Sequence, residues 1–159
     1  MVARDSEAMT TSDREILIMR LFDAPRELVF QAWTDPVHVV QWWGPRGFTS
    51  TILEMDVRPG GVWRLVMHGP DGTDYPNKIV FIEVVKPERL VYNHGGDAEG
   101  DAVEFKVTVT FADQGGKTEL TMHSLFRSAE ERAKVVREFG AIEGANQTLD
   151  RLGEYLAKM

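Results

Sequence analysis

Histidine is the residue type in this sequence best suited to acid–base or metal chemistry, and its four copies are widely separated. His38, His68, His94 and His123 form no pair at the spacing of metal ligands, and no HExxH-type motif is present. His68 and His123 fall on the polar faces of predicted strands. We therefore expect no metal site and no cofactor.

Nucleophilic catalysis finds little support in the sequence. Cysteine is absent, which removes disulfides, thiolate catalysis and cysteine metal sites together. There is no GxSxG elbow, and Gly95-Gly96-Asp97 lacks the strand-to-helix context of a phosphate loop. The paired Glu130 and Glu131 fall at a helix start, where they favour the helix dipole. We assign no catalytic residues, and a non-enzymatic role is favoured.

Three polar residues occupy positions that could face an apolar interior. Tyr92 and His94 end a predicted strand beside the glycine-rich loop 95–101 and could border a cavity mouth. Asn146 lies near the centre of an apolar helix stripe, where burying an amide without partners costs about 1–3 kcal/mol. We expect it to bond to protein, water or ligand. We also predict that Asn146→Leu changes ligand affinity more than melting temperature.

The elements that position these residues follow from the hydrophobic pattern. Residues 14–22 form an apolar, β-branched run typical of a strand, and two short helices are predicted over 25–34, capped by Asp23, and 36–43. Six strands follow, over residues 48–57, 62–68, 78–85, 90–94, 102–111 and 118–126. Short turns between successive strands indicate an antiparallel sheet.

A single long helix is predicted over residues 128–157, with Ser128 as its cap and Glu131 in the capping-box position. Its apolar stripe is interrupted between Ile142 and Leu149, where Asn146 stands. Three glycines lie within it, each costing about 1 kcal/mol relative to alanine. Close approach to the sheet or short helices, or a bend, would explain them; the glycines are Gly140, Gly144 and Gly153.

Composition limits the classes of partner. The apolar fraction of 43% and charged fraction of 27% are ordinary for one globular domain, predicted over residues 14–159 after a disordered lead-in over 1–13. The net charge of −7 and the absence of a Lys/Arg cluster argue against nucleic acid as a partner. No apolar run predicts membrane insertion or a signal peptide, so we expect a cytoplasmic location.

Several segments together resemble the Bet v 1-like (START-like, SRPBCC) helix-grip superfamily. Within it, the chain is similar to the family named for the C-terminal domain of the activator of the Hsp90 ATPase. The segments are Ala24-Pro25 with Val29, Trp33 and Asp35-Pro36; Trp42-Trp43-Gly44-Pro45; Arg58-Pro59-Gly60-Gly61 with Trp63-Arg64; Pro87-Glu88-Arg89-Leu90-Val91; and Gly144 with Leu149, Arg151 and Leu152. The match runs from about residue 15 to 157.

The resemblance implies an α+β fold in which a curved antiparallel sheet of about six to seven strands, two short helices and a long C-terminal helix enclose a cavity. It says less about activity, because the superfamily includes lipid carriers, hormone receptors and polyketide cyclases, and fold alone does not choose among them.

Aromatic, methionine and aliphatic positions supply the candidate cavity wall. Pockets for apolar ligands are mostly apolar with a few oriented polar groups. For most single positions a filled core is the simpler role, but a straight helix cannot touch a curved sheet along its whole length. The candidates are Trp42, Trp43, Trp63, Leu65, Met67, Phe81, Tyr92, His94, Phe105, Val107, Met122, Phe139, Ile142, Asn146 and Leu149.

The sequence therefore favours a binding module that holds a small hydrophobic or aromatic ligand without covalent chemistry, with loops 69–76 and 95–101 as lids. One alternative is a cyclase- or hydrolase-like enzyme acting on a polyketide or similar substrate, for which Tyr92, His94 and Asn146 are the polar candidates. A second alternative is an interaction protein associated with a chaperone ATPase. The oligomeric state is left open, and a homodimer is compatible with the sequence.

Overall fold

The computed structural model describes residues 8–9, 13–96 and 104–159, without the side chains of residues 8, 9, 138 and 139. Its strands form one antiparallel sheet in the order β1-β2-β8-β7-β6-β5-β4-β3. They are β1 (Ala8–Met9), β2 (Glu15–Phe22), β3 (Thr49–Met55), β4 (Val62–His68), β5 (Asp74–Val85), β6 (Arg89–Gly96), β7 (Glu104–Gln114) and β8 (Lys117–Phe126). The predicted α+β class and curved antiparallel sheet are confirmed. The two-residue β1 falls inside the segment expected to be a lead-in.

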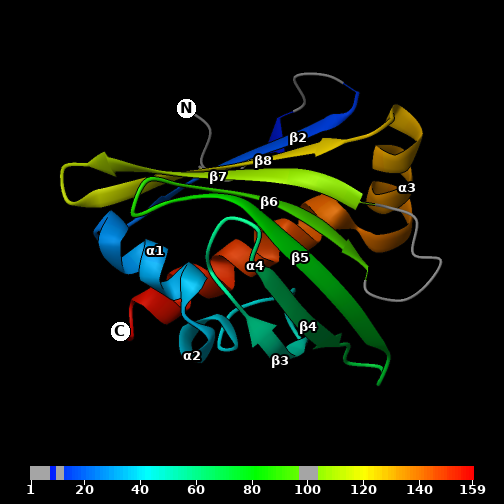
Figure 1. Cartoon of the computed structure of the whole chain (residues 1–159), viewed down its shortest axis with the longest axis horizontal. Helices are drawn as coiled ribbons and strands as arrows, with labels where there is room; N and C mark the ends of the chain where they lie inside the picture. The colour runs from blue at the N-terminus through cyan, green and yellow to red at the C-terminus, as the bar shows by residue number, and fades with distance from the viewer. Residues whose placement is uncertain (1–7, 10–12, 97–103) are drawn as a thin grey trace.

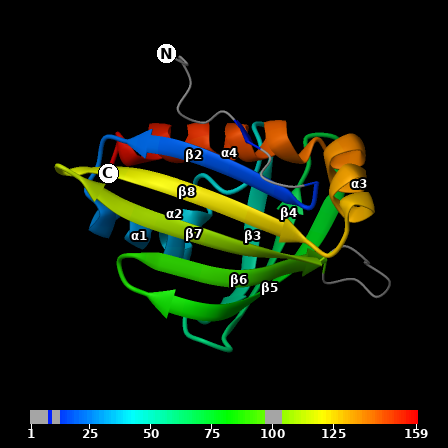
Figure 2. The same cartoon turned by 90° about the horizontal axis from the view of Figure 1, so that it is seen from above.

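The helices cover the inner face of this sheet. They are α1 (Arg26–Thr34), α2 (Pro36–Val39), α3 (Ala129–Phe139) and α4 (Ala141–Leu156). The sheet curves over α1, α2 and α4, while α3 lies at one end (Figure 1). Seen from above, α4 runs alongside β2, near the edge of the sheet (Figure 2). The interior between α4 and the sheet is the region that the sequence predicts as a cavity.

The prediction of one unbroken C-terminal helix is wrong. Gly140 adopts a left-handed conformation, with φ of 58°, and separates α3 from α4. Glycine reaches this conformation without a Cβ penalty, and it commonly ends helices. Of the two explanations for the helix glycines, the bend therefore applies at Gly140.

The other two glycines lie inside α4. A Cβ on Gly144 would lie 3.4 Å from Pro45, and one on Gly153 would lie 3.6 Å from the Phe22 ring. These are ordinary contact distances, the first at their lower limit, so close approach does not require glycine at either position.

The helix caps follow the sequence in part. The side chain of Ser128 accepts a hydrogen bond from the Glu131 backbone amide, as predicted. Asp35 caps α2 by accepting from the Val37 amide. The predicted cap by Asp23 is wrong, because Pro25 occupies the N-cap position of α1 and makes no side-chain cap bond.

Two strands depart from regular pairing. Register shifts occur between Ile52 and Glu54 in β3 and between Phe81 and Glu83 in β5. Such bulges bend a strand and increase its twist, which suits a sheet that curves around helices. β5 also begins at Asp74, so the lid predicted over 69–76 is partly strand. Of the second predicted lid, Gly95 and Gly96 belong to β6 and residues 97–101 lie outside the described part.

Candidate functional site

The predicted cavity residues occupy the inner face of the sheet and the facing side of α4. Alternating burial identifies that inner face: in β7, Val107 and Val109 are buried while Lys106 and Thr110 are exposed. The predicted residues come from β4 to β8, from the segment after α2, and from α4. Phe139 was also predicted, and its side chain lies outside the described part of the chain.

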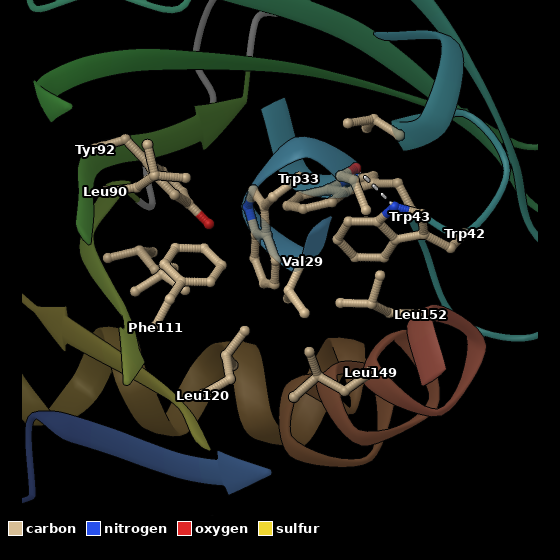
Figure 3. Packing of buried hydrophobic residues seen from close by; sticks show 14 of the residues in the cluster. Val29, Trp33, Trp42, Trp43, Leu90, Tyr92, Phe111, Leu120, Leu149 and Leu152 are labelled. Atoms are coloured by element: carbon tan, nitrogen blue, oxygen red, sulfur yellow. Dashed lines mark hydrogen bonds between the residues drawn. The ribbon is translucent and has the colours of Figure 1, made fainter. Parts of the chain in front are cut away.

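About half of the predicted residues form a filled core. At most 1% of the surface is exposed for Trp42, Trp63, Leu65, Phe81, Tyr92, Val107 and Leu149. Trp43 stands among them, with ring centroids 4.7 Å from Trp63 and 5.4 Å from Trp42. Figure 3 shows Trp42 and Trp43 on the side of the core that faces Leu149 and Leu152 of α4. These side chains act first as packing.

Another group of predicted residues keeps exposed surface although it faces inward. This group comprises Met67, His94, Phe105, Met122 and Ile142. The four apolar members also pack against the core. Met122 is informative because it lies mid-strand in β8, between the buried Leu120 and Ser124. The interior is therefore less tightly closed here than around the tryptophans.

His94 is held as a neutral ring. Burial lowers its pKa to about 4, and its Nε2 lies 2.9 Å from Oδ1 of Asn77. The neutral ring donates this hydrogen bond, because the amide oxygen is an acceptor. The ring also lies against Phe105, with centroids 5.1 Å apart. His94 therefore lines the interior as a neutral, oriented side chain.

Tyr92 lies deeper, on the same strand. Burial raises the pKa of its hydroxyl well above the ordinary value, so the group stays protonated. The hydroxyl points toward the indole of Trp33 (Figure 3). Trp33 Nε1 nonetheless has no hydrogen-bond partner within ordinary distance in the described structure. The indole N–H faces this hydroxyl and opposes the rise in the Tyr92 pKa, so the two groups interact although no hydrogen bond of ordinary length joins them.

Four buried side-chain atoms lack a hydrogen-bond partner among the described residues, and we call them the unpaired atoms. They are Arg20 Nε, Trp33 Nε1, Trp63 Nε1 and Asn146 Oδ1. Each such group costs about 1–3 kcal/mol when nothing satisfies it. Buried indole N–H groups usually find a partner. A bound water molecule or a polar group of a ligand could supply the missing hydrogen bonds of these atoms.

Asn146 is only half satisfied. Its Nδ2 donates to the Ile142 carbonyl over 3.2 Å, while its Oδ1 is one of the unpaired atoms. The residue is 4% exposed, which confirms the burial expected from the sequence. Its bond to Ile142 stays within α4, so it does not tie the helix to the sheet.

Two of the four residues with unpaired atoms, Trp33 and Arg20, are missing from the cavity wall predicted from the sequence. Arg20 is the charged one. It occupies an inward position of β2, between the buried Ile18 and Phe22. Its Nη1 forms an ion pair with Asp150 over 2.8 Å, and its Nη2 donates to the Asn146 carbonyl over 3.4 Å. The alternation of side chains along β2 could have placed Arg20 inside. Residues 16, 18 and 22 form the apolar face of this strand, and residue 20 lies on the same side.

Arg151 holds α4 against the loop that follows α2. Its Nη1 donates to the carbonyls of Gly44, Pro45 and Phe48 over 2.8, 3.1 and 3.2 Å. Burial and the neighbouring Arg46 lower the pKa of Arg151. The C-terminal half of α4 is therefore anchored near the tryptophan cluster.

Among the other histidines, His38 links α2 to α4, with its Nδ1 2.6 Å from the Tyr155 hydroxyl oxygen. His68, on the outer face of β4, lies 2.8 Å from Thr51 Oγ1 and 2.7 Å from Asp74 Oδ1. These distances resemble a hydrolase triad, but all three side chains are exposed on the outside of the sheet. We therefore interpret the hydrogen bonds from Thr51 through His68 to Asp74 as a link between the three strands β3, β4 and β5. In the described residues, no group of three or more His, Asp or Glu side chains could hold a metal ion.

Among the described residues, two of the surface pockets can be compared with the predicted cavity wall. One, of about 370 Å³, lies at the end of β7 and β8 and includes the predicted residue Phe105. The other, of about 340 Å³, lies outside α4 and has a polar lining of Gln41, Arg46, Gly47, Arg151, Glu154, Tyr155 and Lys158. The polar pocket contains none of the predicted cavity residues.

A curved antiparallel sheet packed against a C-terminal helix defines a helix-grip protein of the Bet v 1-like fold. The sequence profile of the family described as "Activator of Hsp90 ATPase homolog 1-like protein" matches residues 23–157, and the chain belongs to this family. A comparison with curated proteins finds no match. No helix in the described ranges is long and apolar enough to cross a membrane.

Solved structures support the same assignment. A protein from Arthrobacter aurescens is 25% identical, with a TM-score of 0.89, and the match covers 98% of this chain and 93% of that one. Protein Ms6760 from Mycobacterium smegmatis is 27% identical, with a TM-score of 0.86, covering 96% and 97% of the two chains. A protein from Rhodobacter sphaeroides is 26% identical, with a TM-score of 0.84 and coverage of 96% and 99%.

Proposed function

We propose that this protein binds a small hydrophobic or aromatic molecule in the interior between α4 and the sheet, without covalent chemistry. The observation that carries the proposal is the set of unpaired atoms, which lie in an interior lined mainly by apolar side chains. Sites for apolar ligands combine this kind of wall with a few polar groups that orient the ligand.

The inward residues that retain exposure support the same proposal. Met67, Phe105, Met122 and Ile142 come from four different elements and all pack against the core while keeping exposed surface. Apolar surface that faces inward and is not fully buried gives a hydrophobic ligand something to cover, at about 25 cal/mol per Å² removed from water.

The two titratable residues inside favour binding over catalysis. A general acid or base works best with a pKa near the working pH. The pKa of His94 is lowered to about 4, and that of Tyr92 is raised well above its ordinary value. Both groups are therefore neutral near pH 7 and act as fixed hydrogen-bonding groups. The enzyme alternative needs a substrate that changes these environments.

The experiment is a thermal-shift screen with small aromatic compounds, followed by mass spectrometry of the recovered compound. We expect a raised melting temperature and an unchanged compound. Ile142→Trp should fill the half-open interior and remove the shift, whereas Leu53→Trp, on an exposed position of β3, should not. A compound recovered as a new product would instead support the enzyme alternative.

The chaperone alternative has a separate test, namely binding to and stimulation of an Hsp90-type ATPase at micromolar concentration. Stimulation that survives Ile142→Trp would favour the interaction role over ligand binding. A cytoplasmic location is part of our proposal and is supported by the absence of cysteine in the sequence.

A further inference from the structure

We propose that the bound molecule carries a hydroxyl group, which is recognised between Nε–H of Arg20 and Oδ1 of Asn146. This inference rests on the proposed function and names the chemical class of its ligand. Both atoms belong to the unpaired set, one a donor and the other an acceptor. They come from β2 and α4, which run side by side and are in direct contact at this point.

The two residues are already in contact through other atoms. Arg20 Nη2 donates to the main-chain carbonyl of Asn146, and Nη1 pairs with Asp150 one helical turn further on. The Nδ2 of Asn146 is used by Ile142. In the described structure, each side chain is thus held in place by its neighbours and has one buried polar atom left over.

The remaining donor and acceptor do not satisfy each other, although they are complementary. A group that accepts one hydrogen bond and donates another would satisfy both, and a hydroxyl is the simplest such group. An ether or ketone would satisfy only Arg20. A carboxylate would place its charge beside Asp150 and an acceptor against Asn146 Oδ1. The pair therefore selects an alcohol or phenol over these groups.

Ile142 lies one turn before Asn146 on α4 and keeps exposed surface, which makes it the route to the pair in this proposal. The unpaired atoms themselves are closed to solvent. Binding therefore requires α4 to move slightly away from the sheet near its N-terminus. The left-handed Gly140 begins the helix there, with open space where a Cβ would stand.

The test uses three naphthalene probes substituted at the same ring position with hydroxyl, methyl or methoxy groups. Calorimetric titration of the full chain should give at least about tenfold tighter binding of naphthol than of methylnaphthalene, with the methoxy compound between them. This preference should fall to about twofold or less in Asn146→Leu and in Arg20→Lys, which keeps a charge for Asp150 but lacks Nε–H. Gln147→Leu, the adjacent amide on α4, is the matched control and should keep the preference.

Equal affinity of wild type for naphthol and methylnaphthalene would overturn this inference while leaving the proposed function standing. Failure of all three probes to bind would overturn both. Should Asn146→Leu fail to fold, Arg20→Lys carries the test alone. A tenfold preference that survives in Arg20→Lys would contradict the assigned donor.

Discussion

His94 illustrates how the interior handles a polar side chain at the scale of one residue. It faces inward, touches aromatic rings and donates to Asn77, and burial lowers its pKa to about 4 from an ordinary 6.5. Because the folded state prefers the neutral ring, protonation favours unfolding. The stability that this preference gives is present above about pH 6.5 and is lost progressively as the pH falls toward 4.

We predict that His94→Gln, which can still donate to Asn77, reduces the loss of stability in mild acid. Between about pH 7 and pH 5, wild type should lose about 1–2 kcal/mol more than the variant. Urea unfolding at the two pH values measures this difference, and His68 and His123 are common to both proteins. Parallel pH profiles would show that His94 is not protected from protonation in the fold.

For Asn146, we predict a larger effect on ligand binding than on stability. Its amide bonds only within α4, and its Oδ1 is unpaired in the described structure. Asn146→Leu should therefore change the melting temperature little while weakening naphthol binding about tenfold. Thermal unfolding and calorimetry on one preparation compare the two effects. A large loss of stability with unchanged affinity would assign Asn146 a structural role.

At the scale of elements, the break between α3 and α4 and the anchoring of α4 determine where the interior opens. Gly140 ends one helix and begins the next, and Arg151 holds the far half of α4 to the loop after α2. The N-terminal half of α4, with Ile142 and Asn146, lies between these points. This half is also tied to β2, through the bond from Arg20 to the Asn146 carbonyl, which a ligand-induced movement would have to break.

Gly140→Ala should destabilise the protein by about 1–2 kcal/mol, because alanine resists the left-handed conformation. Gly153→Ala is the matched control: it lies inside α4 at ordinary contact distance from Phe22 and should gain up to about 1 kcal/mol. Chemical unfolding of both variants tests this contrast. Stabilisation by Gly140→Ala would indicate a continuous helix instead of the observed break.

Arg151→Met should cost about 2 kcal/mol, because three carbonyls lose a charged donor. The comparison is Arg46→Met, which removes an exposed ion pair with Glu154 and should cost less than about 1 kcal/mol. Equal effects of the two substitutions would mean that the Arg151 contacts do not anchor α4.

At the scale of the whole molecule, hydrophobic periodicity was enough to predict the order of elements and the inner face, because both depend on local patterns. The break at Gly140 was missed, since a glycine inside a helical pattern costs little enough to read as continuous helix. The start of β5 was missed because Pro76 argues against a strand. It is tolerated there since β6 pairs with β5 only from Asn77 onward.

The ion pair of Arg20 could not be predicted from local sequence patterns. Its ion-pair partner Asp150 lies at the opposite end of the chain, and only the fold brings the two together. The sequence also could not distinguish the wall residues that are fully buried from those that keep exposed surface. Both are made of the same residue types, and only packing distinguishes Phe81 from Phe105.

The most direct test of ligand binding is mass spectrometry of protein purified from its own host, under native and then denaturing conditions. We predict a native mass larger than the denatured mass by one small molecule, released intact and carrying a hydroxyl group. Equal native and denatured masses, both as purified and after incubation with excess naphthol, would contradict the account.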